Sequence, residues 1–552
     1  MSYVGARVKR KEDWRLLRGA GKFVGDIRLT GMVHAAILRS PCAHARILNI
    51  DTKPAAKAPG VLGVFTAADI PAMKTIPMRT GRIPGLERSQ QTPLAKEKVR
   101  YVGDPVAVVV AEDRYVAEDA LELIEVEYEQ LGAVTDLRDA IQSGAPTLHE
   151  AVPNNIAATF QVNVGDVERA LAEADLVLEE EFSAQRHGAV PMETRGLVAE
   201  FDEARGILTV WGPTKMTHTN WRMLSELLGL PQSCIHFIEP DVGGGFGARG
   251  EFYPEDFLIP FAAMHFRRPI CWIEDRSENL KAMNHSREQK HRVKIGAKKD
   301  GTIVAMEAEI LFNMGGYTRT HGGVPAIAAS AMLRGPYRIK NYRCNVFCIL
   351  TNKTPAGTYR SPGRYEANFV RERMLDLLAH RLGLDPAEVR RRNFIRPEEM
   401  PYNNGPHPFH YMIYDTGDYP AQLEHALQRI GYESLKSNCA AARQQGRALG
   451  VGIGCFIETS GLGPWEYARV EIDNAGKVVL YSGCNSVGQG VDTCLSQIVA
   501  DELQVSIDDV RVVHGDTDKV PYGNGSNASR TTVMAGSAAL GASQKVKDKL
   551  FR

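Results

Sequence analysis

The stretch Asp241 to Gly250, DVGGGFGARG, contains five glycines in ten residues and decides how the rest of the chain is interpreted. It follows a strand predicted over 235–239 and precedes a predicted helix. Glycines at such a turn let backbone amides approach an anion or a flat ring system, and a helix start adds positive potential. The stretch therefore predicts a ligand site, with a tight turn that binds nothing as the alternative.

The same stretch satisfies the dinucleotide pattern G-x-G-x-x-G at Gly245, Gly247 and Gly250, with Glu274 at a plausible distance downstream. The run of glycines ahead of it is not typical of that pattern. No Lys-Ser or Lys-Thr follows, so a P-loop is excluded. An NAD site is a further hypothesis that titration with NAD would test.

Two other loops are rich in small hydrogen-bond donors. Residues 483–490 (GCNSVGQG) lie between a predicted strand and a helix predicted over 491–503, and residues 524–532 (NGSNASRTT) supply hydroxyls and amides. Each loop can place donors against negative charge. Three such loops in one chain favour a single large polyanionic ligand, and phosphate-bearing cofactors of that size are few.

Length and composition set the outer limits. A chain of 552 residues predicts about three to four domains. The 66 basic and 66 acidic residues balance, which argues against a protein that mainly grips nucleic acid or a membrane surface. Nine cysteines without a CxxC pair support neither a disulfide scaffold nor an iron–sulfur or zinc motif. Without a secretory leader or an apolar run of ~20 residues, we expect a cytoplasmic protein.

Hydrophobic patterns predict a mixed α+β architecture rather than one doubly wound sheet. The expected strands cover 105–112, 125–128, 208–211, 235–239, 449–457, 466–472 and 477–482. The expected helices cover 114–124, 218–229, 366–381, 419–431 and 491–503, and a further one starts at 385–388. A linker at 142–155 closes a first unit near residue 135, and 402–417 is a polar crossing.

Six segments together resemble one family, the xanthine dehydrogenase and aldehyde oxidase family, and specifically the large, molybdopterin-binding subunit of its bacterial members. In chain order they are RLLRGAGKFVGDI (15–27), VRYVGDPVAVVVAE (99–112), GGGFGAR (243–249), TYRSPGRYE (358–366), VGQG (487–490) and GSNASRTT (525–532). The resemblance covers essentially the whole chain. It implies an α/β hammerhead-like domain at 1–135, a first molybdopterin-binding domain at 136–400 and the N-terminal part of a second at 401–552.

The resemblance implies a subunit of a molybdenum hydroxylase that oxidises an aldehyde or an N-heterocycle with water as the oxygen source. The cofactor is expected to be molybdopterin with molybdenum, which in bacteria is usually the cytosine dinucleotide. Electrons would leave through iron–sulfur clusters and FAD. This chain carries neither cluster cysteines nor a flavin motif, so an iron–sulfur subunit and an FAD subunit are expected as partners.

By the same resemblance, fourteen residues bind the cofactor: Gly244, Gly245, Phe246, Gly247, Ala248, Arg249, Gly488, Gln489, Gly490, Ser526, Ala528, Ser529, Arg530 and Thr532. Phe246, Arg360 and Ala528 are expected near the molybdenum, none of them as a side-chain ligand. The Arg360 guanidinium could stabilise negative charge that develops on an oxygen or nitrogen. A surface ion pair is the alternative role for it.

Two departures from the family matter. Lys215 stands where the family usually has a glutamine that reaches the apical oxo ligand of the molybdenum. A buried ammonium is costly unless it is paired, so either the lysine points away or the contact with the oxo ligand differs. The G-x-G-E segment that carries the family's catalytic glutamate does not occur in residues 1–552, and Glu193 and Glu251 do not match it.

We therefore expect a further chain to supply the catalytic glutamate. Loss of a general base typically costs about 10²–10⁴ in rate, so this polypeptide alone should be close to inactive. The alternative is a non-catalytic cofactor-binding or assembly homologue.

The substrate is poorly constrained by the sequence. Residues 360–364 lack the Cys-Ser sequence of the carbon monoxide dehydrogenases. The glutamate of purine-oxidising relatives corresponds to Gly250, and Glu251 is one position further along. Neither specificity is supported.

Overall fold

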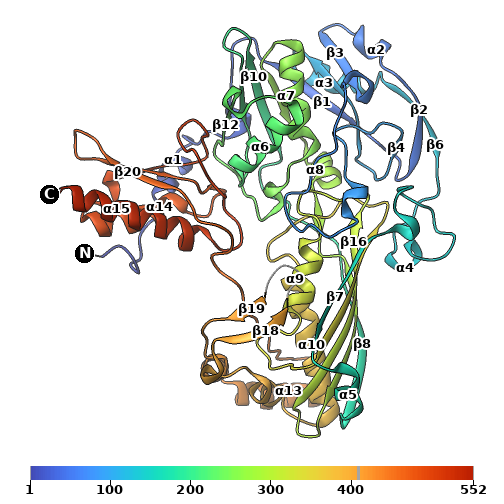
Figure 1. Cartoon of the computed structure of the whole chain (residues 1–552), viewed down its shortest axis with the longest axis vertical. Helices are drawn as coiled ribbons and strands as arrows, with labels where there is room; N and C mark the ends of the chain where they lie inside the picture. The colour runs from blue at the N-terminus through green and yellow to red at the C-terminus, as the bar shows by residue number, and fades with distance from the viewer. Residues whose placement is uncertain (1, 407–410, 551–552) are drawn as a thin grey trace.

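A computed structural model describes residues 2–406 and 411–550 (Figure 1). Its central element is a seven-stranded sheet with the strand order β12-β11-β10-β13-β1-β5-β3. The strands are β1 (Val33–Arg39), β3 (Val61–Thr66), β5 (Pro105–Ala111), β10 (Gly196–Asp202), β11 (Ile207–Trp211), β12 (Ile235–Ile238) and β13 (Ile270–Ile273). Because β1 pairs with β13 in parallel, the sheet runs through the unit boundary expected near residue 135.

Strand β5 explains why this sheet forms. All seven of its residues are buried, as its continuous β-branched run predicts. Helix α7 (Pro254–Phe266) packs on one face of the sheet and α3 (Arg114–Leu121) on the other. The strand and helix predicted at 105–112 and 114–124 are confirmed.

A second, five-stranded sheet with the order β7-β17-β16-β15-β8 forms the long strands in the lower part of Figure 1. Its strands are β7 (Ile156–Val164), β8 (Leu176–Ala184), β15 (Gln289–Ala297), β16 (Ile303–Gly315) and β17 (Tyr342–Leu350). The helices beside it include α9 (Val324–Met332), α10 (Arg364–Leu382) and α11 (Pro386–Asn393). Asp385 caps α11 by accepting a hydrogen bond from the Ala387 amide at 2.7 Å, as the Asp-Pro-Ala-Glu pattern predicts.

The C-terminal part forms a separate body, drawn in red in Figure 1. It consists of β20 (Ala468–Ile472), β21 (Val478–Ser482), β22 (Val510–Val513), α14 (Val491–Leu503) and α15 (Gly536–Leu550). Helix α1 (Lys11–Leu17) lies against this body, because the Lys11 amide donates to Thr493 Oγ1 at 2.8 Å. The first residues of the chain therefore pack on the C-terminal body rather than on the rest of the first unit.

The remaining elements are short and lie around these three bodies. The strands are β2 (Ala45–Asp51), β4 (Lys98–Val99), β6 (Glu125–Gln130), β9 (His187–Gly188) and β14 (His285–Ser286). The helices are α2 (Lys53–Ala56), α4 (Leu137–Ala140), α5 (Val167–Ala172), α6 (Thr217–Leu228), α8 (Arg276–Ala282), α12 (Tyr419–Ile430) and α13 (Tyr432–Gln444). No helix within the described ranges is both long and apolar enough to cross a membrane.

Two local predictions were wrong. The strand expected at 449–457 is an irregular segment, because its carbonyls bond to arginine side chains instead of to a neighbouring strand. Arg390 donates to Ile453 O at 2.9 Å, and Arg371 donates to Cys455 O at 2.6 Å. The crossing expected at 402–417 contains two paired strands, β18 (Tyr402–Pro406) and β19 (Tyr411–Tyr414), while residues 407–410 of it lie outside the described residues.

Candidate cofactor site

The glycine stretch 241–250 joins β12 to α7 and has no room for side chains where it meets other loops. Gly247 has φ +102°, and a Cβ there would lie 3.0 Å from the Thr358 carbonyl oxygen. A Cβ on Gly245 would lie 3.2 Å from the Val487 side chain. Phe246 is left-handed, with φ 47°, and is 47% exposed. The glycines are therefore needed for close contact with two other loops.

The helix expected directly after this stretch is displaced. A single 3₁₀ turn (Ala248–Gly250) comes first, and α7 begins only at Pro254. The amides of the glycine stretch consequently do not sit at an α-helix N-terminus. The loop at 483–490 does, because Gly490 is the N-terminal cap of α14.

Arg360 lies directly against the glycine stretch through its backbone. Its amide donates to the Phe246 carbonyl at 2.7 Å, and Arg287 donates to the carbonyls of Arg360 and Ser361, the latter at 3.1 Å. The Arg360 side chain is exposed and forms no ion pair with the described residues. The structure thus brings Phe246 and Arg360 together and leaves the guanidinium available to a ligand.

The side chain of Gln489 forms hydrogen bonds within the 483–490 loop. Its Oε1 accepts from the Val487 amide at 2.6 Å, and its Nε2 donates to the Asn485 carbonyl at 3.0 Å. Gly488 and Gln489 are both exposed. The turn presents exposed backbone next to the start of α14.

The loop at 524–532 contacts the 483–490 loop and Lys215, whose amide in turn donates to the Arg249 carbonyl. The Ser526 amide donates to the Lys215 carbonyl at 3.0 Å, and Ser526 Oγ accepts from the Asn485 amide at 3.2 Å. Ala528 and Ser529 are left-handed, with φ 46° and 50°. Four loops that are far apart in the sequence therefore converge at one place.

The other two predicted residues of the 524–532 loop lie at its far end. Arg530 is buried and paired with Glu466, and its Nε donates to the Leu462 carbonyl at 3.0 Å. Thr532 is exposed, with its Oγ1 3.5 Å from Cys494 Sγ. Arg530 therefore anchors the loop from within the protein.

The Arg249 side chain fixes the glycine stretch through hydrogen bonds to its backbone and to neighbouring residues. Its guanidinium donates to Gly244 O at 3.1 Å, to Glu193 Oε2 at 3.0 Å and to Thr194 O at 2.9 Å. Glu193 Oε2 also accepts from the Gly243 amide at 2.8 Å. Burial raises the pKa of the Glu193 carboxyl. Both side chains are used in fixing the loop, and a direct contact of Arg249 with a cofactor stays a prediction.

Glu239, at the end of β12, is a site residue that the sequence analysis missed. Its Oε1 accepts from the Ser486 amide at 3.0 Å, and its Oε2 lies 3.2 Å from Thr217 Oγ1 and also contacts Asn485 Nδ2. Burial raises the pKa of this carboxyl to about 8. The sequence offered one signal for this residue, namely an acidic side chain between an apolar strand and a glycine-rich turn.

A cluster of buried polar side chains lies under the same loops. Glu251 accepts hydrogen bonds from His321 Nδ1 and Thr320 Oγ1. His321 Nε2 lies 2.6 Å from Arg79 Nη2 and 3.2 Å from Thr358 Oγ1. Burial lowers the pKa of His321 to about 4. Burial would raise the pKa of Glu251, but its contacts with His321 and Thr320 and the nearby Arg79 outweigh this effect and lower that pKa to about 2. Glu251 is therefore ionised and His321 neutral at pH 7.

The donor set fits an organic anionic cofactor. Backbone amides, the Ser526 hydroxyl and glycines without Cβ atoms surround the point where the loops meet. Among the residues that the structure describes, no three His, Cys, Asp or Glu side chains lie together in a way that could hold a metal ion.

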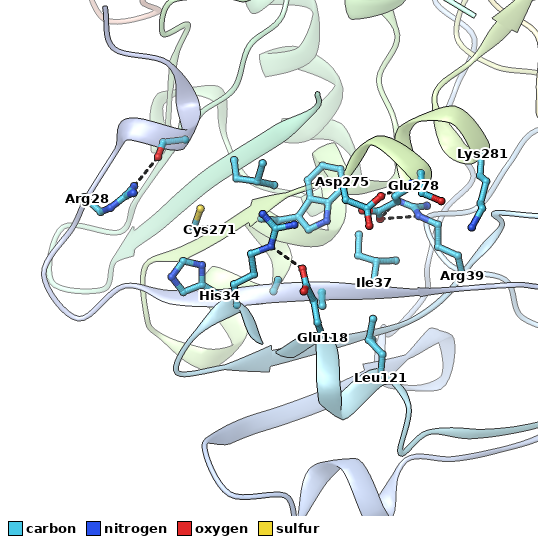
Figure 2. Close-up of a pocket in the computed structure, with 17 residues that line it drawn as sticks. Arg28, His34, Ile37, Arg39, Glu118, Leu121, Cys271, Asp275, Glu278 and Lys281 are labelled. Carbon is cyan, nitrogen blue, oxygen red and sulfur yellow. Dashed lines mark hydrogen bonds and ion pairs between the residues drawn. The ribbon is translucent and has the colours of Figure 1, made fainter. Parts of the chain in front are cut away.

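A separate cavity of about 440 Å³ lies between α3 and α8 over the seven-stranded sheet (Figure 2). Ile37, Trp272 and Cys271 contribute to its walls. Charged side chains at its edge pair with each other, Arg39 with Glu278 at 2.7 Å and Arg114 with Glu118 at 2.6 Å. It contains none of the predicted site residues and is distinct from the convergence of the four loops.

Comparisons with known proteins agree with this geometry. The family described as "Aldehyde oxidase and xanthine dehydrogenase, a/b hammerhead domain" matches residues 18–132, and "Molybdopterin cofactor-binding domain" families match 148–394 and 425–552. The 6-hydroxypseudooxynicotine dehydrogenase complex subunit gamma of Paenarthrobacter nicotinovorans is 38% identical, over 100% of this chain and 70% of its own length. The carbon monoxide dehydrogenase large chain of Afipia carboxidovorans is 35% identical, over 99% and 70%.

A solved structure supports the same assignment. Quinoline 2-oxidoreductase from Pseudomonas putida 86 superposes with a TM-score of 0.93 at 34% identity, covering 99% of this chain and 70% of that one. The matched domains and this neighbour confirm the predicted fold class, a hammerhead-type domain followed by molybdopterin-binding domains. The chain belongs to the aldehyde oxidase and xanthine dehydrogenase family, as a molybdopterin-binding large subunit of the bacterial type.

Proposed function

We propose that this chain holds the molybdenum cofactor of a hydroxylase that oxidises an N-heteroaromatic substrate, with oxygen taken from water. The observation that carries the proposal is the meeting of loops at the glycine stretch, where Gly245 approaches Val487 and the Arg360 amide binds the Phe246 carbonyl. An aldehyde is the other substrate class that the family resemblance implies. Relatives named nicotine 6-hydroxylase large subunit, 36% identical, and quinoline 2-oxidoreductase favour a nitrogen ring.

The cofactor, when bound, supplies the redox chemistry and the transfer of oxygen. The fourteen predicted residues would hold it, mainly through backbone amides and hydroxyls of the three donor-rich loops. The Arg360 guanidinium is exposed beside Phe246 and would stabilise negative charge on the substrate's ring nitrogen or oxygen. Phe246 and Ala528 would bring backbone rather than side-chain ligands near the metal.

Several finer assignments belong to the same proposal. The cofactor would be the cytosine dinucleotide form, and an iron–sulfur subunit and an FAD subunit would carry the electrons away. We also propose unit boundaries near residues 135 and 400 and a cytoplasmic location.

No G-x-G-E segment, which carries the family's general base, occurs in residues 1–552. The chain spans about 70% of the length of the first relative. Neither Glu193 nor Glu251 is free to act as that base, since both are bound to buried cations or hydrogen-bond donors.

The test uses the complex purified from its own source. We expect about one molybdenum per chain by elemental mass spectrometry, a cytosine nucleotide after mild acid hydrolysis, and ¹⁸O from labelled water in the product of an N-heteroaromatic substrate. Arg360→Ala is the matched variant, which should keep its molybdenum and lose turnover. Molybdenum without turnover of any heteroaromatic or aldehyde substrate would instead support the non-catalytic homologue. A protein without molybdenum would contradict the proposal.

A further inference from the structure

Lys215 is a largely buried lysine between two of the site loops. Its amide donates to the Arg249 carbonyl at 3.3 Å, and its carbonyl accepts from the Ser526 amide at 3.0 Å. The residue is only 8% exposed. Its Nζ makes no hydrogen bond or ion pair with any residue in 2–406 or 411–550. A cation in such a position ordinarily has a counter-ion.

The charges that face Lys215 do not balance. Arg79 is always protonated, and it donates to the Gly250 carbonyl at 2.7 Å and to neutral His321. Glu251 is the one anion of the cluster, and its oxygens are taken up by His321 and Thr320. Two cations therefore face a single anion. Burial, with Arg79 as a second cause, lowers the pKa of Lys215 to about 8.

The chain makes room for this side chain. Gly250 lies beside it, and a Cβ there would overlap Lys215 Cε and lie 3.2 Å from both Lys215 Nζ and His321 Cε1. The cluster reaches the glycine stretch through Thr358, whose Oγ1 donates to the Gly247 carbonyl at 3.3 Å. The unpaired charge thus lies directly under the loop that carries Phe246, and not on a remote surface.

We propose that the Lys215 ammonium binds an anionic oxygen of the ligand that fills this site, which makes Lys215 a specificity-determining residue. The oxygen is carried either by the substrate, as a carboxylate or an ionised ring hydroxyl, or by the bound cofactor. The inference deepens the proposed function and rests on it for the identity of that ligand. A compact ammonium suits a single oxygen better than the planar fork of arginine.

The experiment measures binding rather than turnover. Benzoate is the probe for a substrate oxyanion, benzamide is its neutral analogue, and molybdenum retained through gel filtration reports on the cofactor. The native complex carries either wild-type Lys215, Lys215→Met, or the exposed control Lys340→Met. If the substrate carries the oxygen, Lys215→Met weakens benzoate at least tenfold, leaves benzamide unchanged and keeps its molybdenum. If the cofactor carries it, molybdenum retention falls at least tenfold and benzoate is unaffected.

Stability of the cofactor-free protein gives an independent readout. Removing an unpaired buried cation should raise its melting temperature, because the ammonium has no partner to lose. A lower melting temperature in Lys215→Met would show that the ammonium is paired within the chain and would overturn the inference. Unchanged benzoate binding together with unchanged molybdenum retention would also overturn it. A native complex without molybdenum that still binds benzoate through Lys215 would contradict the proposed function alone.

Discussion

Replacing Glu239 by glutamine tests whether a protonated carboxyl holds the 483–490 loop. The side chain is buried at the end of β12, and its Oε1 accepts from the Ser486 amide at 3.0 Å. Glutamine has a similar shape and keeps an acceptor oxygen for the Ser486 amide, but it cannot ionise. The substitution removes the titration, and its amide nitrogen takes the place of the oxygen that Thr217 and Asn485 contact.

The expected magnitude follows from the pKa. Burial raises the pKa of Glu239 from 4.5 to about 8, so the folded loop favours the protonated form. Its contribution to stability is complete below pH 4.5 and is lost as the pH rises toward 8. One proton corresponds to about 1.4 kcal/mol per pH unit, so the free energy of opening should fall by about 2.7 kcal/mol between pH 5.5 and 7.5. This is roughly 100-fold in the opening equilibrium.

Hydrogen exchange followed by mass spectrometry measures this opening for peptides that cover 483–490. After correction for the intrinsic pH dependence of exchange, wild-type protection should fall about tenfold per pH unit, and Glu239→Gln should be flat. Glu226→Gln, an exposed substitution on α6, is the control and should behave as wild type. Equal slopes in wild type and Glu239→Gln would refute the argument. A loss of protection already at pH 5.5 would show that the negative charge itself holds the loop.

Three further predictions concern the glycine stretch and Arg360, whose amide binds it. Gly247→Ala should destabilise the loop by about 1–3 kcal/mol, because the φ of +102° and the Thr358 carbonyl oxygen, 3.0 Å from an added Cβ, both oppose a side chain. We expect a reduced molybdenum content in the purified variant, and a full content would contradict the prediction. Arg249→Met leaves the partly buried Glu193 without its cation and should cost about 1–3 kcal/mol, seen as a lower melting temperature that Glu193→Gln partly restores. Arg360→Ala should change stability by less than about 0.5 kcal/mol yet lower kcat/KM about 10²–10³-fold, whereas a parallel loss of stability would indicate a structural role.

The elements that sequence patterns predicted well are those whose cause is local. The strand at 105–112, the helix at 491–503 and the cap at Asp385 depend on neighbouring residues, and the structure has all three. The pairing of β1 with β13 joins residues that are more than 200 positions apart, and no local pattern reports such a contact. The strand predicted at 449–457 failed because Arg371 and Arg390, which come from distant helices, bind its carbonyls.

The candidate site also contains some parts that local sequence predicts and others that depend on long-range contacts. Motifs located the loops, and the structure joins the Arg360 amide to the Phe246 carbonyl and Ser526 to Asn485. The residues that hold those loops have no motif, since Glu239 and Glu193 act through a few hydrogen bonds to backbone amides and to side chains from distant segments. Spacing carries no signal for a contact of that kind.

This division has a physical reason. A loop made of glycine, serine and alanine has little apolar surface to bury, so hydrophobic packing cannot fix its position. What remains is hydrogen bonding of its backbone to buried charged groups, and the structure uses it repeatedly, with Arg249 and Glu193 on the glycine stretch and Glu466 with Arg530 on the 524–532 loop. Such groups are stable in the interior because each has its counter-charge in the protein, and together they preorganise the loops before a ligand arrives. Lys215 lies among them and is the exception, since its Nζ forms no ion pair with the described residues and the nearby Glu251 also faces Arg79. If the pairing of charges explains the rest of the site, the missing partner of Lys215 has to come with the ligand.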